Sequence, residues 1–125
     1  MTKRPARCAC GQLQVVCDGE PSLVSVCHCR DCQRRTGSAF GIAAFYDAER
    51  VEISGTSKTF TRPSDTGYPV TFHFCPECGT SVYWLPARKP SQIAVAGGAF
   101  ADPGFLAPTK SAYPERRLPW VADPE

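Results

Sequence analysis

Seven of the eight cysteines stand in three short clusters, and their spacing constrains the fold more strongly than any other feature of the chain. The first cluster reads C-x-C-G, the second C-x-C-x-x-C and the third C-x-x-C-G. Their cysteines are Cys8 and Cys10, then Cys27, Cys29 and Cys32, then Cys75 and Cys78. The outer pairs together supply four thiolates, enough to enclose a tetrahedral zinc ion, whereas the triplet supplies three and leaves one coordination position open. We therefore expect two zinc ions per chain, one structural and one catalytic.

The composition is that of a single globular domain spanning residues 1–125. Hydrophobic residues make up 42% of the chain and charged residues 21%, which is ordinary for a soluble folded protein. Twelve prolines and ten glycines favour short elements joined by frequent turns over long helices. The net charge is +2 and no run of five like charges occurs, so the sequence gives no electrostatic basis for binding nucleic acid.

The N-terminal residues 1–7 are basic but are followed by no apolar stretch, so they do not resemble a secretory signal. The longest apolar runs, residues 40–46 and 93–100, are too short to cross a bilayer. We therefore expect a cytoplasmic, reducing location and no membrane partner. In such a compartment eight cysteines are better explained as metal ligands than as disulfides, although an even number of cysteines in a small chain leaves disulfides as the alternative.

Alternating apolar and polar residues predict a mainly antiparallel β-domain with one short helical turn. The expected strands cover residues 12–17, 23–26, 40–46, 51–54, 58–62, 68–74, 80–85 and 93–100. A helical turn over 30–35, ended by Gly37, and a loop over 62–67 are also expected. Phe60 is predicted to point inward from its strand. The proline-rich tail from Ala101 is predicted to lie on the surface, anchored by Tyr113 and Trp120.

The C-x-x-C-G cluster is the stronger half of the predicted structural site. Pro76 presets the turn, and Gly79 permits the positive φ that lets main-chain N–H groups face the sulfurs. The C-x-C-G pair supplies the two missing ligands. A shared metal would tie the N-terminus to the second half of the sheet and contribute several kcal/mol to folding. The alternative is two separate pairs that share no metal.

The triplet combines three thiolates with nearby arginines. If the chain is extended, Cys27 and Cys29 face the same side, and Cys32 completes the set after a short turn. Three thiolates lower the Lewis acidity of zinc and suit it to a soft ligand such as an incoming thiol. Arg34 and Arg35, just past the ligands, are the candidates for binding an anionic substrate. The alternative is that they are solvated surface charges.

Three other residues are assigned roles outside the two ligand sets. His28 lies between two ligands and is expected to point away from the metal, in a packing role. His73 is interpreted as a sheet-surface histidine, with a catalytic base as the alternative. Cys17 is interpreted as a small buried hydrophobe. As alternatives, Cys17 is a redox partner or a fourth ligand that would close the second zinc site.

These motifs resemble those of the glutathione-dependent formaldehyde-activating enzyme family, whose domain is shared with centromere protein V. The resemblance rests on Cys8-x-Cys10-Gly11, on Cys27-His28-Cys29-x-x-Cys32-x-Arg34-Arg35-Thr36-Gly37-Ser38-x-Phe40 and on Phe74-Cys75-x-x-Cys78-Gly79-Thr80. It implies an Mss4-like fold of small antiparallel sheets. It also implies a structural zinc on Cys8, Cys10, Cys75 and Cys78 and a catalytic zinc on Cys27, Cys29 and Cys32.

The activity implied by the resemblance joins glutathione and formaldehyde to give S-hydroxymethylglutathione. In the reverse direction this is a carbon–sulfur lyase reaction. Developing negative charge would be stabilised by Arg34, by Arg35 or by a main-chain N–H between Thr36 and Ser38. The competing class is a zinc-stabilised binding module without catalytic activity, because folds of this kind host both.

Overall fold

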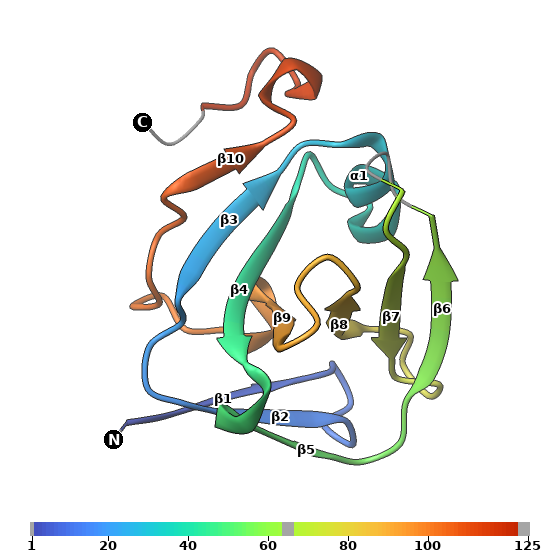
Figure 1. Ribbon diagram of the computed structural model, residues 1–125, viewed down its shortest axis with the longest axis vertical. Coiled ribbons are helices and arrows are strands. Elements are labelled where there is room, and N and C mark those ends of the chain that lie inside the picture. Colours follow the sequence, from blue (N-terminus) through green and yellow to red (C-terminus); the bar gives the residue numbers. More distant parts are fainter. Residues whose placement is uncertain (1, 64–66, 123–125) are drawn as a thin grey trace.

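Short strands separated by turns make up most of the chain, as the sequence predicts (Figure 1). The computed structural model describes residues 2–63 and 67–122, so part of the predicted loop over 62–67 lies outside the described residues. Three strands form an antiparallel sheet in the order β1-β2-β5. Their bounds are Lys3–Arg7 for β1, Gln14–Asp18 for β2 and Val51–Ser54 for β5.

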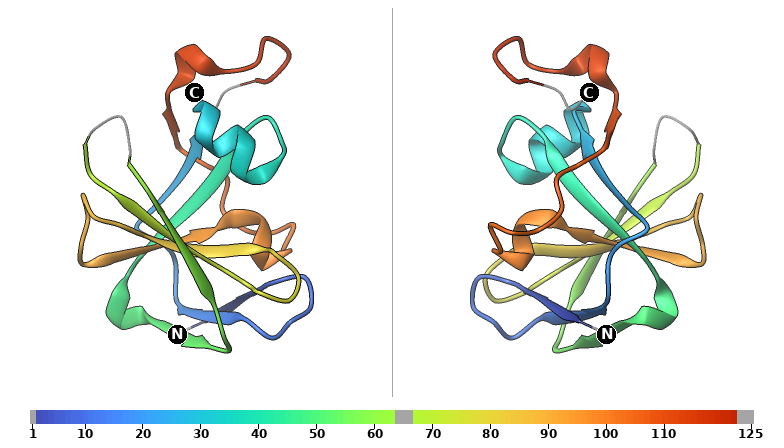
Figure 2. Two further views of the ribbon diagram at one scale, coloured as in Figure 1. Left: turned by 90° about the vertical axis from the view of Figure 1, so that its right-hand side faces the viewer. Right: turned by 90° about the vertical axis from the view of Figure 1, so that its left-hand side faces the viewer.

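The second sheet has the strand order β10-β3-β4-β9-β8-β7-β6. Its strands are β3 (Leu23–Cys27), β4 (Gly41–Asp47), β6 (Lys58–Arg62), β7 (Val70–Phe74), β8 (Ser81–Pro86), β9 (Gln92–Ala96) and β10 (Lys110–Ala112). Neighbouring strands are antiparallel except for β10, which runs parallel to β3. The three-stranded sheet lies at one end of the molecule, and α1 and the C-terminal segment lie at the other (Figure 2).

The main core lies where the two sheets meet, and it contains cysteines of the predicted structural site. Cys8 and Cys75 are buried there with Cys17, Leu13 and Tyr46. A smaller apolar cluster, formed by Phe72, Trp84 and Ala94, is separate from it. The four-thiol set is thus continuous with the main core. No helix in the described residues is long and apolar enough to cross a membrane.

The one α-helix among the described residues, α1 (Arg30–Thr36), confirms the predicted helical turn. It begins after Cys29, whose Sγ accepts a hydrogen bond from the Cys32 N–H at 3.3 Å. It ends at Gly37, which adopts a left-handed conformation with φ 64° and donates its N–H to the Gln33 carbonyl. The turn that brings Cys32 back toward Cys29 is therefore capped by one of the predicted ligands.

Two predicted side-chain placements are wrong: the inward-pointing Phe60 and the surface anchor Trp120. Phe60 is 61% exposed, because β6 is the edge strand of the larger sheet and its ring faces an open cavity. Trp120 is 77% exposed, whereas the neighbouring Val121 is buried. The last predicted strand also ends early, since β9 stops at Ala96 and the chain continues as a 3-10 helix, Gly97–Phe100.

The tail from Ala101, predicted to lie on the surface, also contributes a strand to the larger sheet. It adds β10 beside β3, and the His28 N–H donates to the Ala112 carbonyl at 3.0 Å. The 3-10 helix Pro114–Arg116 then reaches α1, where the Arg116 carbonyl accepts hydrogen bonds from Arg30 and Gln33. Another 3-10 helix, Ala48–Arg50, joins β4 to β5. The C-terminal segment thus supports the stretch that carries the triplet.

Replacement of Gly55 by alanine is expected to destabilise the fold by about 3 kcal/mol or more, because positive φ and a backbone clash act together. A Cβ at this position, where φ is +94°, would lie 1.9 Å from the Gln12 carbonyl oxygen. Gly37 is the matched control, since its φ is +64° but no atom lies within 4 Å of its added Cβ. Gly37→Ala should cost only about 1–2 kcal/mol. Urea unfolding of both variants measures the difference, and equal costs would contradict this account.

Candidate metal centres

The four cysteines of the outer pairs meet in one cluster, with all sulfurs within 4.8 Å of one another. Cys8 and Cys10 come from the turn between β1 and β2, and Cys75 and Cys78 come from the turn between β7 and β8. The Sγ of Cys10 lies 3.6 Å from that of Cys8 and 3.7 Å from that of Cys75. The two pairs therefore lie together as a set of four sulfurs that could hold one metal ion.

The two turns have matching architecture. In each, a glycine with positive φ, Gly11 or Gly79, donates its N–H to the carbonyl of the first cysteine of its pair. In each, main-chain N–H groups face the sulfurs: that of Leu13 points at Cys8 Sγ and that of Glu77 at Cys75 Sγ. These donors stabilise thiolates, which is the form that binds a metal.

Two polar side chains join the turns, and the sequence does not reveal either. The Gln12 amide exchanges two hydrogen bonds with the main chain of Thr56 and also donates to Cys75 Sγ at 3.0 Å. The Thr80 hydroxyl lies 3.3 Å from Cys78 Sγ and accepts the Ala9 N–H. Groups that bond to ligands in this way orient them for a metal.

The cluster fits one tetrahedral ion. A Zn–S bond of about 2.3 Å gives a sulfur–sulfur edge of about 3.8 Å, close to the separations of 3.6 and 3.7 Å that are found. All eight cysteines lie in the described residues and all are free thiols, so the disulfide alternative is not supported. The Thr80 side chain and, to a smaller extent, the Thr80 main-chain N–H donate hydrogen bonds to Cys78 and lower its pKa to about 5. Cys78 therefore contributes a thiolate to the donor set at neutral pH.

The cysteines of the triplet form a second cluster with sulfurs within 4.8 Å of one another. Cys27 ends β3, Cys29 caps α1, and Cys32 lies in the first turn of that helix. Hydrogen bonds from the thiols of Cys27 and Cys32 lower the pKa of Cys29 to about 2. The hydrogen bond to Cys29 in turn raises the pKa of Cys27. The three sulfurs thus share a negative charge and suit a bound cation.

Cys17 belongs to neither cluster. It is fully buried in the main core on β2, and burial raises the pKa of its thiol to about 12. The interpretation as a small buried hydrophobe is supported, and the alternative of a fourth ligand is not. Among the described residues, the second cluster therefore consists of three sulfurs, those of Cys27, Cys29 and Cys32.

Neither histidine belongs to the two cysteine clusters. His28 is fully buried, with its ring edge-on to that of Phe40 at 5.9 Å, which agrees with a packing role. His73 stacks on Tyr83, and its Nδ1 lies 2.8 Å from Ser57 Oγ and 3.0 Å from the Tyr83 hydroxyl. Burial lowers the pKa of His73. His73 lines neither of the cavities beside α1, so the geometry favours a structural role over a catalytic base.

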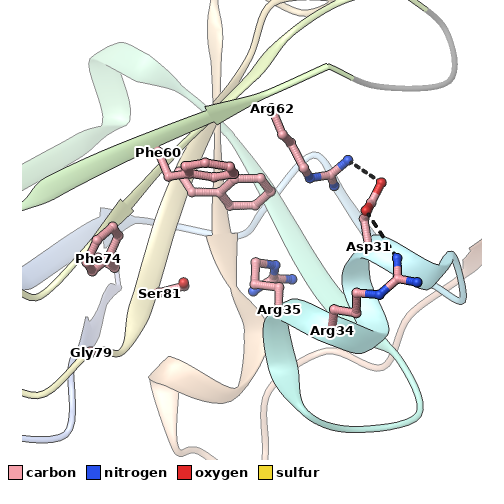
Figure 3. Close-up of a pocket in the computed structure, with 9 residues that line it drawn as sticks. Asp31, Arg34, Arg35, Phe60, Arg62, Phe74, Gly79 and Ser81 are labelled. Atoms are coloured by element: carbon pink, nitrogen blue, oxygen red, sulfur yellow. Dashed lines mark hydrogen bonds and ion pairs between the residues drawn. The ribbon is translucent and has the colours of Figure 1, made fainter.

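Two neighbouring cavities lie beside α1. One cavity has a volume of about 500 Å³ and is lined largely by small residues, among them Gly41. Its lining extends to Cys78 of the four-cysteine cluster. The second, of about 410 Å³, is lined by Arg34, Arg35 and Arg62 together with phenylalanine rings (Figure 3). Both cavities share Arg35, Gly79 and Ser81.

Gly41 places the first cavity against the triplet. A Cβ on Gly41 would lie 3.6 Å from Cys32 Sγ and 2.6 Å from Arg35 Nη2. The Cys32 sulfur and the Arg35 guanidinium therefore both pack against Gly41, and a side chain at this position would clash with the guanidinium. Gly41 is a third residue that the sequence reasoning misses, because its importance depends on a contact between α1 and β4.

The two candidate arginines differ in their surroundings. Arg34 is exposed and lies 3.9 Å from the Asp31 carboxylate, an ion pair within α1. Arg35 is partly buried, with its guanidinium 4.4 Å from the centre of the Trp84 ring and 5.3 Å from that of Phe72. Within the described residues no carboxylate pairs with Arg35. The geometry therefore favours Arg35 as the anion-binding candidate.

The main-chain donors expected between Thr36 and Ser38 are already used. The Gly37 N–H bonds to the Gln33 carbonyl at 2.8 Å, and the Ser38 N–H bonds to Thr36 Oγ1 at 3.1 Å. The Thr36 hydroxyl in turn donates to the Cys32 carbonyl. The Thr-Gly-Ser sequence thus ends α1, and the prediction that it supplies a free N–H donor is wrong for these two residues.

The fold and the two sites define a small, mainly β protein with a four-cysteine and a three-cysteine metal-binding cluster. The sequence pattern of the glutathione-dependent formaldehyde-activating enzyme family matches residues 3–116, so the chain belongs to that family. This confirms the resemblance, and the architecture confirms the expected mainly β, Mss4-like fold.

A crystal structure of a Rhodobacter sphaeroides protein, determined as a structural genomics target, has the same fold. The alignment has a TM-score of 0.63 and 17% sequence identity, and it covers 86% of this chain and 99% of that one. The comparison with curated proteins gives no match.

Proposed function

We propose that the protein is a zinc-dependent enzyme that catalyses the reversible addition of glutathione to formaldehyde. In this reaction the thiol sulfur forms a bond to the carbonyl carbon, the C=O π bond opens, and the thiol proton ends on the new hydroxyl oxygen. The reverse reaction breaks the carbon–sulfur bond, as a carbon–sulfur lyase does. The observation that carries the proposal is a cluster of three sulfurs, beside two cavities, in a chain of this family.

The two clusters are assigned different tasks. Cys8, Cys10, Cys75 and Cys78 would hold a structural zinc ion, and Cys27, Cys29 and Cys32 would hold the catalytic one. When bound, zinc with three thiolate ligands supplies an open position that stabilises the thiolate form of a substrate. We expect a reducing, cytoplasmic location, because oxidation would pair these closely spaced thiols.

The residues of this chain would then position the substrates. The cavity that includes Gly41 is lined largely by small residues, which leave room for an extended peptide-like thiol. Arg35 lies at the junction of both cavities and would bind a carboxylate or offset negative charge on the developing alkoxide. Arg34 is a second anion contact, weaker because it is exposed and pairs with Asp31.

Exchange NMR of formaldehyde and glutathione, with and without catalytic amounts of the metal-loaded protein, tests the proposal. We expect the protein to increase the rate at which free glutathione and its hydroxymethyl adduct interchange, without changing their equilibrium ratio. The Cys17→Ala variant should behave like the wild type, since that thiol lies outside both clusters. Equal interchange rates with and without protein would remove the named activity and favour a zinc-stabilised binding module.

A further inference from the structure

The arginine-lined cavity is larger and more apolar than a one-carbon aldehyde requires. Its volume of about 410 Å³ lies in the range of pockets that bind drug-sized molecules, about 300–1,000 Å³. Phe60, Phe72 and Phe74 line it together with three arginines. Formaldehyde has no apolar body and no charge, so it makes use of neither feature.

We propose that this cavity binds the carbonyl substrate through an aromatic ring and a carboxylate, so that the chain accepts anionic aromatic aldehydes. The inference rests on the proposed function for the reaction itself, since the same addition of thiol to aldehyde would occur. It goes beyond that function by assigning a substrate class. The peptide-like thiol would occupy the neighbouring cavity, and the two substrates would meet beside Arg35.

The apolar floor of the cavity is a pair of neighbouring rings. Phe60 on β6 and Phe72 on β7 are cross-strand partners, so their side chains lie on the same face of the sheet. Phe72 is buried, whereas Phe60 is 61% exposed at the sheet edge. A flat ligand ring placed against Phe60 would remove this apolar surface from water, which favours binding.

The charges around the cavity favour an anion. Three guanidinium groups face it, and one carboxylate, Asp31, is present to offset them. Arg62 pairs with Asp31 at 3.1 Å, and Arg34 approaches the same carboxylate at 3.9 Å (Figure 3). Arg35 is left without a carboxylate among the described residues, and the lining has a net positive charge.

Arg35 is also held in place for such a contact. Its guanidinium lies over the rings of Trp84 and Phe72, and its Nε is buried without a hydrogen-bond partner in the described structure. Stacking on rings fixes the plane of the guanidinium, which reduces the entropy that a bidentate contact must overcome. A carboxylate would therefore find a preoriented donor beside an aromatic floor.

Fluorine NMR titrations with 4-fluorobenzoate test the site without requiring the reaction. Two probes are matched controls: 4-fluorobenzamide has the ring without the charge, and trifluoroacetate has the charge without the ring. We expect 4-fluorobenzoate to bind at least tenfold more tightly than either. Comparable dissociation constants for the three probes would overturn the inference.

Variants locate the binding. Phe60→Ala and Arg35→Gln should each weaken 4-fluorobenzoate binding tenfold or more. Leu106→Ala and Arg88→Gln are the matched controls, because these residues do not line the cavity, and they should leave the affinity unchanged. If Phe60→Ala and Arg35→Gln bound the probe like the wild type while remaining folded, the site assignment would be wrong.

Turnover separates this inference from the proposed function. We expect catalysed thiol addition to 4-carboxybenzaldehyde to exceed that to benzaldehyde by tenfold or more in kcat/KM. Tight 4-fluorobenzoate binding without turnover of any aldehyde would leave the cavity as an anion site and remove the enzymatic function. Turnover of formaldehyde with no preference among the probes would keep the function and remove the inference.

Discussion

Replacement of Cys75 by serine is expected to unfold the domain. Cys75 is fully buried, and Cys8 in the same cluster is almost as inaccessible. Structural zinc supplies about 10–16 kcal/mol of binding free energy in zinc-finger peptides. That is comparable to the whole stability of a domain, about 5–15 kcal/mol. Loss of one ligand from a site that joins the β1–β2 turn to the β7–β8 turn should therefore exceed what the remaining core can offset.

Circular dichroism during heating, together with metal analysis, measures this outcome. Cys17→Ser is the matched control, because Cys17 is equally buried but belongs to no cluster. Its cost should be limited to about 1–3 kcal/mol for burying a hydroxyl group, so that variant should still unfold cooperatively with its metals bound. A strong chelator should unfold the wild type as well. A Cys75→Ser variant with the wild-type melting curve would refute the structural role of this site.

The two metal clusters are predictable from the sequence because ligand geometry is nearly independent of topology. A tetrahedral ion requires sulfurs about 3.8 Å apart, so the spacing within each pair already restricts the turn that holds it. Glycine after the last cysteine marks the same turn at Gly11 and Gly79. The two outer pairs are then expected to combine, because a closed tetrahedral site needs four ligands and each pair supplies two.

The remaining features depend on tertiary position, which periodicity does not encode. Phe60 alternates correctly in its strand but lies at the edge of the sheet, where one side has no neighbouring strand. The sequence gives no signal for β1, which carries Pro5 and three basic residues, or for β10, which has three residues. Gln12 and Gly41 act through contacts between segments far apart in the chain.

Removal of Cys27 is expected to abolish catalysis while leaving the fold intact. Among the three cysteines of the triplet, Cys27 is the best to replace, since Cys29 also caps α1 and Cys32 lies within that helix. Cys27 ends β3 at its junction with the helix and is only partly buried. The Cys27→Ala variant should therefore lose the second metal ion and keep the first.

The expected loss of activity is at least about 100-fold, because even groups that only orient metal ligands are worth about 10–100-fold. Exchange NMR of the thiol–aldehyde adduct measures the rate, and metal analysis should give one ion per chain for the variant and two for the wild type. The melting temperature should remain close to that of the wild type, which separates loss of chemistry from loss of fold. Retention of wild-type exchange rates by a folded Cys27→Ala protein that binds one metal ion would show that the triplet does not carry the reaction.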